Sequence, residues 1–202
     1  MEQDMTQAQF KALIGQTLFR PREAARVLIS MRLPGHWLWT ALALMAVLNA
    51  IVYSVSLTVA GPGDPNAPMM MPAAFHAPVL FALLLFLALV LTVLSLFWVG
   101  VKFGGRAAIE DILVLITWLQ VLRLMLQVGV TILVLAMPAL AMIVIMVASI
   151  WGIYILVGFV AEAHGFVSSL GALGVICLAL LVMAIGLTIV FSILGVAVME
   201  GA

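Results

Sequence analysis

The fold is decided by residues 112–161, ILVLITWLQVLRLMLQVGVTILVLAMPALAMIVIMVASIWGIYILVGFVA, a stretch with one charged side chain, Arg123. As a single helix this stretch would extend about 75 Å, far more than the ~30 Å hydrocarbon core of a bilayer. Pro138 lies near its middle, and a proline lacks the backbone N–H that continues a helix. The stretch therefore predicts two membrane-spanning helices joined by a tight turn at Pro138.

The rest of the chain has the same apolar character. Of its 202 residues 67% are hydrophobic and 8% are charged, and the mean hydropathy is +1.37, which excludes a soluble globular domain. We therefore predict an all-α membrane protein, a five-span transmembrane helical bundle. The expected spans are about 37–60, 79–101, 111–135, 140–161 and 169–198. The expected domains are an arm, 1–36, and a transmembrane domain, 37–198, so any function lies in the bundle, its short loops or the arm.

Basic residues are distributed unevenly along the chain. They precede the first span or lie between the second and third spans, as Lys11, Arg20, Arg22, Arg26, Arg32, Lys102 and Arg106. The segment 61–78 has neither lysine nor arginine. Because cytoplasmic loops are enriched in these residues, we expect a cytoplasmic amino terminus, an exterior carboxyl terminus and an odd number of spans.

The amino-terminal arm is expected to form two short amphipathic helices. Thr6 is a suitable N-cap for the first helix, and Pro21 suits the first position of the second. In the second helix an apolar side, lined by Ala24, Val27, Leu28 and Met31, lies opposite Arg22 and Arg26. We therefore predict that Arg22, Arg26, Arg32, Lys102 and Arg106 contact an anionic inner leaflet. The alternative is that these residues only fix the topology.

Arg123 is expected to lie past the middle of the third span. A central arginine costs at least about 2.5–3.5 kcal/mol in a bilayer, so it should face the bundle or water. Gln120 and Gln127 share its side of the helix, and Asn49 of the first span has a similar depth. We predict an intramembrane polar cluster of these four residues. In the alternative, Arg123 extends to the outer interface and the glutamines serve as helix–helix contacts.

Motifs for catalysis, cofactors and metals are missing from the sequence. Cys177 is alone, and the three histidines, His36, His76 and His164, belong to different loops or span ends. Gly104 and Gly105 lack the lysine that a phosphate-binding loop requires. We therefore expect no enzyme activity, no cofactor, no bound metal and no nucleic-acid partner.

Three segments together resemble the Yip-domain family of integral membrane proteins. They are RPREAARVLISMRLPGHWLW (20–39), FGGRAAIEDILVLITWLQVLR (103–123) and WGIYILVGFVAEAHGFVSSLGA (151–172), with Pro138 between the last two. The resemblance covers residues 20 to about 195 and depends on the order and spacing of these segments. It implies a compact five-span bundle with a cytoplasmic amino terminus. Eukaryotic members are similar to adaptors of vesicle traffic that engage prenylated small GTPases, generally through a longer arm.

Arginine outnumbers lysine six to two, and with the abundant alanine this suggests a GC-rich bacterial genome. We expect a non-enzymatic, multi-pass protein of the bacterial inner membrane, with a periplasmic carboxyl terminus. It would organise or scaffold membrane lipid, other membrane proteins or copies of itself. The alternative function is a small-solute transporter or channel in which Arg123 attracts an anion.

Overall fold

The computed structural model describes residues 6–60 and 78–193 of the chain. Within these ranges it contains seven helices and no strand, which confirms the predicted all-α fold. The helices are α1 (Gln7–Phe19), α2 (Pro21–Ser30), α3 (Gly35–Ala60), α4 (Pro78–Lys102), α5 (Ile109–Ala136), α6 (Pro138–His164) and α7 (Ser169–Ile193). Helices α3 to α7 are long and apolar enough to cross a membrane. The chain is thus a multi-pass membrane protein.

The predicted break at Pro138 is confirmed. Helix α5 ends at Ala136, α6 begins at Pro138, and the N–H of Met137 between them donates to the carbonyl of Leu133 at 2.7 Å. Proline fits here because the first N–H of a helix has no partner within that helix. The predicted connection over 61–77 and the last predicted residues of the fifth span, 194–198, lie outside the described residues.

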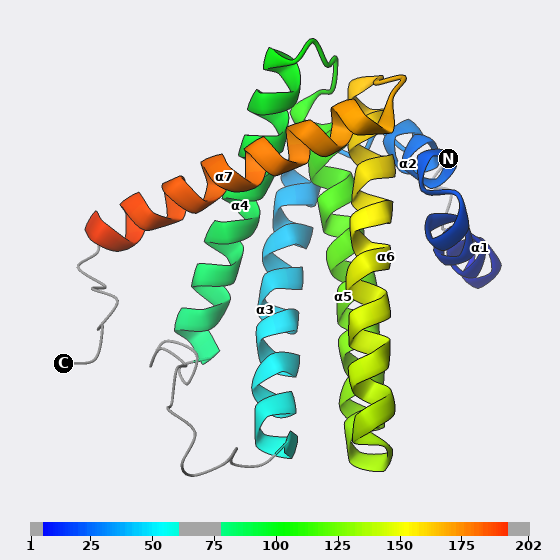
Figure 1. Ribbon diagram of the computed structural model, residues 1–202, viewed down its shortest axis with the longest axis vertical. Coiled ribbons are helices and arrows are strands. Elements are labelled where there is room, and N and C mark those ends of the chain that lie inside the picture. Colours follow the sequence, from blue (N-terminus) through cyan, green and yellow to red (C-terminus); the bar gives the residue numbers. More distant parts are fainter. Residues whose placement is uncertain (1–5, 61–77, 194–202) are drawn as a thin grey trace.

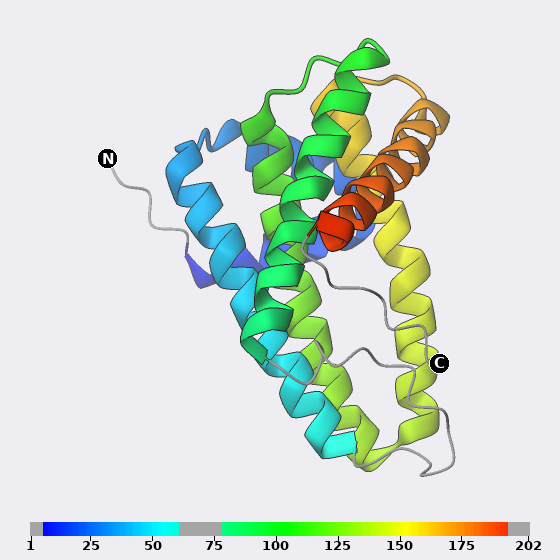
Figure 2. The same cartoon turned by 90° about the vertical axis from the view of Figure 1, so that its left-hand side faces the viewer.

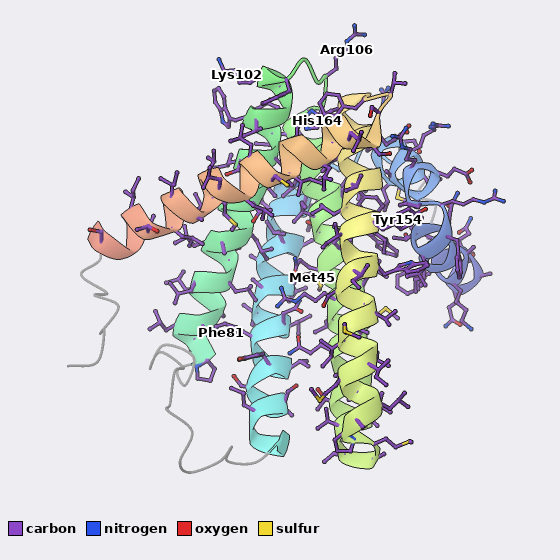
Figure 3. The ribbon with its side chains drawn as sticks, in the orientation of Figure 1. Met45, Phe81, Lys102, Arg106, Tyr154 and His164 are labelled. Atoms are coloured by element: carbon purple, nitrogen blue, oxygen red, sulfur yellow. The ribbon has the colours of Figure 1, made fainter. Side chains whose placement is uncertain are left out.

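Helices α3 to α6 run beside one another as a bundle, whereas α7 crosses α4 obliquely and extends beyond it (Figure 1). Near the crossing, Thr92 of α4 lies 3.1 Å from the sulfur of Met183 on α7. Lys102, Arg106 and His164 lie at the same end of the bundle (Figure 3), which we call the basic end. The two short helices, α1 and α2, cover the side of α5 and α6 that faces away from α7 (Figures 1 and 2).

The buried core lies toward the basic end. Leu113 of α5 and Phe159 of α6 are almost completely buried. Toward the other end of the same two helices, Ile132 is 65% exposed and Met142 is 72% exposed. Apolar side chains exposed on a membrane span are expected to face lipid, so the α5–α6 pair is packed by protein only along part of its length.

Close contacts at the basic end depend on glycine. The ring of His164, which is buried, packs directly against the backbone of Gly100 on α4 and of Gly105 in the following loop. The N–H of Arg106 also donates to the carbonyl of His164 at 3.2 Å. A β-carbon on either glycine would overlap the imidazole, and this explains why glycine occupies both positions.

Helix α1 has the predicted N-cap, because the hydroxyl of Thr6 accepts from the N–H of Gln9 at 3.3 Å. It is fixed to the bundle by two tryptophans. The indole N–H of Trp118 donates to the hydroxyl of Thr17 at 3.0 Å, and that of Trp151 donates to the carbonyl of Leu18 at 2.9 Å. Indole groups in apolar surroundings need such acceptors, so α1 is held against α5 and α6 at defined points.

Helix α2 begins at Pro21 as predicted, and it packs on α6. Pro21 lies over Gly158, where a β-carbon would be 2.7 Å from the proline ring. Ala24 and Leu28 of the predicted apolar side are buried, whereas Val27 and Met31 are each 39% exposed. The buried side is therefore rotated from the predicted one, because it is set by contact with α6.

We predict that Gly100→Ala destabilises the fold by about 1–3 kcal/mol, because the new methyl group overlaps the His164 ring. The measurement is reversible unfolding in mixed micelles. Gly129→Ala is the matched control, since nothing lies within 4 Å of its added β-carbon. In a His164→Ala background, Gly100→Ala should cost much less stability than it does in the wild type, because the imidazole that it would overlap is gone. Equal destabilisation by both glycine substitutions would contradict the proposed packing.

We predict that Thr17→Val loosens α1, because it leaves the buried indole N–H of Trp118 without its acceptor, at a cost of about 1–3 kcal/mol. Amide hydrogen exchange in α1 should become roughly tenfold faster. Thr17→Ser keeps the hydroxyl and should exchange like the wild type. Unchanged protection of α1 in Thr17→Val would show that this bond does not anchor the helix.

Candidate functional site

Two of the four residues predicted to form the polar cluster join α3 to α5. Asn49 is 1% exposed, and its amide donates to the carbonyl of Met45 at 2.8 Å and to the carbonyl of Gln120 at 3.4 Å. The contact to α5 is thus made to the Gln120 backbone and not to its side chain. This contact places Asn49 of α3 beside Gln120 of α5.

Gln120, Arg123 and Gln127 line a common groove of about 910 Å³. Its walls are Ile14 and Leu18 of α1, Tyr53 of α3, the part of α5 from Leu119 to Val130 and the part of α6 from Ile143 to Leu156. Most of these side chains are apolar. The structure therefore brings three of the four predicted residues to one surface, while Asn49 lies outside the groove.

The groove exists because α5 and α6 converge at Met137 and diverge toward the basic end (Figure 2). Toward the basic end, Ile14 and Leu18 of α1 line this space, and the indoles of Trp118 and Trp151 hold α1 against the pair. We call this space the α5–α6 groove, and α1 forms its boundary on the side of the basic end.

Arg123 is an exposed side chain of this groove. Among the described residues no carboxylate lies within 4.0 Å of its guanidinium, since the ion pairs there join Arg20 to Glu23 and Arg26 to Glu162. Gln120 is 8% exposed, and its side-chain oxygen has no hydrogen-bond partner in the described structure. The groove thus offers a cation on an apolar wall, which is an arrangement for binding an amphipathic anion.

The basic residues predicted to contact the inner leaflet fall into two groups. Arg26 donates to the carboxylate of Glu162 at 2.8 Å, and this hydrogen bond together with the charge of Glu162 raises the pKa of Arg26. Arg22 lies 3.4 Å from the carbonyl of Val167 and 3.3 Å from the hydroxyl of Ser169. These two side chains connect α2 to α6 and to the start of α7.

The second group consists of three exposed residues, Arg32, Lys102 and Arg106. Lys102 and Arg106 lie at the basic end (Figure 3). None of the three makes an ion pair with another described residue. The contact between Arg26 and Glu162 was missed in the sequence analysis. A single carboxylate near the end of an apolar span was the available signal, because such a group requires a partner.

Nothing in the described residues resembles a catalytic centre with a metal. No three histidine, cysteine, aspartate or glutamate side chains gather there in a way that would hold a metal ion. Cys177 is an exposed, free thiol on α7. The chemistry that the described groove supplies is binding, through one charge, two amides and an extended apolar wall.

Comparisons with known proteins bear on the whole bundle. The family model described as the Yip1 domain matches residues 15–190, a range that includes part of α1, all of α2 to α6 and most of α7. No curated protein and no solved structure matches the chain. Since the family model covers most of the sequence and the structure has the five long apolar helices that the resemblance implied, the chain belongs to the Yip1 domain family.

Proposed function

We propose that this protein is a non-enzymatic organiser of membrane lipid that holds an anionic lipid in the α5–α6 groove. It acts in the bacterial inner membrane, with its basic end toward the cytoplasm and its carboxyl terminus on the periplasmic side. The uneven distribution of lysine and arginine supports this orientation. Membership of the Yip1 domain family supports a role within the bilayer and does not specify a ligand.

The observation that carries the proposal is the position of Arg123 in the groove. A guanidinium near the centre of a span costs about 2.5–3.5 kcal/mol or more, so it is expected to have an anionic or polar partner there. The described residues supply no carboxylate for it. A lipid phosphate or carboxylate can accept hydrogen bonds from Arg123 and from the amide of Gln127, while the apolar wall contacts the acyl chain.

Anion transport is the second candidate function, since the same cation lines a large groove. The position of α1 favours lipid over a solute. A solute that crossed the membrane along this groove would have to pass α1 at its wider end, where Trp118 and Trp151 hold the helix by hydrogen bonds. A lipid enters from the side, between α5 and α6, and needs no such passage.

We predict that Arg123→Leu reduces the anionic lipid retained by the purified protein by about tenfold or more, because a charge-assisted hydrogen bond is lost. The measurement is lipid analysis after extraction in native nanodiscs. The same substitution should raise stability by up to about 3 kcal/mol, since it removes a charge from the span. Ser149→Ala is the matched control. Its hydroxyl also lines the groove but is bonded to the carbonyl of Ile145 at 2.8 Å.

Unchanged retention of anionic lipid by Arg123→Leu would refute lipid binding at this site. Anion flux measured in liposomes tests the second candidate. Flux that wild-type protein supports and Arg123→Leu abolishes would make transport the function. Equal lipid retention and no flux in both proteins would leave Arg123 without either role and would overturn both candidates.

A further inference from the structure

A second cavity, of about 420 Å³, lies among the C-terminal part of α2, the start of α5 and the end of α6. We call it the α2 cavity. Its lining residues are Arg26, Ile29, Ser30, Arg32, Asp111, Glu162 and Ala163. None of the residues of the α5–α6 groove is among them. The two sites are separate, so binding in the α2 cavity is independent of the function proposed for Arg123.

The α2 cavity contains one satisfied ion pair and two charges that are not paired with each other. Arg26 and Glu162 are joined at 2.8 Å and form part of its wall. Arg32 and Asp111 make no ion pair within 4.0 Å in the described residues. One oxygen of Asp111 accepts from the N–H of Ala108 at 2.9 Å, and a carboxylate has further acceptor capacity. The cavity thus presents a free cation and a free anion at separate positions.

The backbone of Arg32 is strained. Its φ is +44°, and it is the one non-glycine residue with positive φ in the described structure. It lies just after α2, where glycine is the usual residue because a β-carbon makes the left-handed conformation unfavourable by roughly 1–2 kcal/mol. An arginine therefore reduces stability at this position, and Arg32 is one of the residues that line the α2 cavity. A role in binding accounts for the residue where folding alone does not.

We infer that the α2 cavity binds a phospholipid whose headgroup carries a phosphodiester and a primary ammonium group. The phosphate accepts hydrogen bonds from Arg32, and the ammonium group donates to Asp111, so one zwitterion satisfies both free charges. An anionic headgroup without the ammonium leaves Asp111 unpaired. A quaternary ammonium has no N–H to donate. Phosphatidylethanolamine has the required chemistry, and it is a lipid of the interface at which α2 and the ends of α5 and α6 are expected to lie.

The test compares thermal stabilisation of the full-length protein, in neutral detergent, by short-chain phosphatidylethanolamine, phosphatidylcholine and phosphatidylglycerol. We expect phosphatidylethanolamine to bind about tenfold more tightly than the other two. Arg32→Gly should abolish this preference and leave the lipid-free protein at least as stable as the wild type, because glycine relieves the positive φ. Arg106→Gly is the matched control. It removes an exposed arginine from the same end of the bundle but not from the cavity, and should keep the preference.

Asp111→Asn provides an independent variant. Its amide oxygen can still accept from the N–H of Ala108, so α5 should fold, while the charge that binds the ammonium is lost. Loss of the preference in this variant would support the inference. Retention of the preference by Arg32→Gly, or equal binding of the three lipids by wild-type protein, would overturn it. If free phosphoethanolamine stabilises the protein as strongly as the lipid does, the ligand is a soluble zwitterion and the inference of a lipid is overturned.

Discussion

Hydrocarbon offers no hydrogen-bond partners, and this constraint shapes each polar group in the bundle. Backbone groups are satisfied within long helices. Several hydroxyl and amide groups on the spans bond to carbonyls one turn earlier, as in the contacts of Thr92 with Ala88 at 2.7 Å and Asn49 with Met45 at 2.8 Å. The indole of Trp118 is satisfied by a helix from the arm. Against this pattern, a guanidinium on an apolar wall requires a separate explanation.

The arm determines the shape of the bundle at its basic end. Helix α1 contributes Ile14 and Leu18 to the α5–α6 groove, and α2 lies over α6 with Pro21 at Gly158. A further long span in that space would fill it along the whole length of the pair. The two short helices of the arm cover the α5–α6 pair only toward the basic end. The groove therefore remains open along the part of the pair that carries Arg123. The arm is therefore a component of both cavities, because it also supplies Arg26 and Arg32.

Features with local signals were predictable from the sequence. Thr6, Pro21 and Pro138 mark helix boundaries through their own backbone chemistry, and apolar length alone identifies the spans. Contacts between distant residues were not predictable. The guanidinium of Arg26 can pair equally well with a lipid phosphate or with a protein carboxylate. The sequence alone therefore could not show that its partner is Glu162. The bond from Trp118 to Thr17 joins positions 101 residues apart, and no periodicity indicates such a pair.

Three departures from local preference coincide with the two cavities. Arg123 places a charge on an apolar wall, the side-chain oxygen of Gln120 is buried without a partner, and Arg32 has a positive φ. Each lowers stability, and a leucine or a glycine would remove two of these costs. A sequence normally agrees with its fold at every level except where function requires otherwise. Arg123 and Arg32 each line one of the two cavities and each carries a cost that a leucine or a glycine would remove, and this is the physical reason to regard both cavities as binding sites.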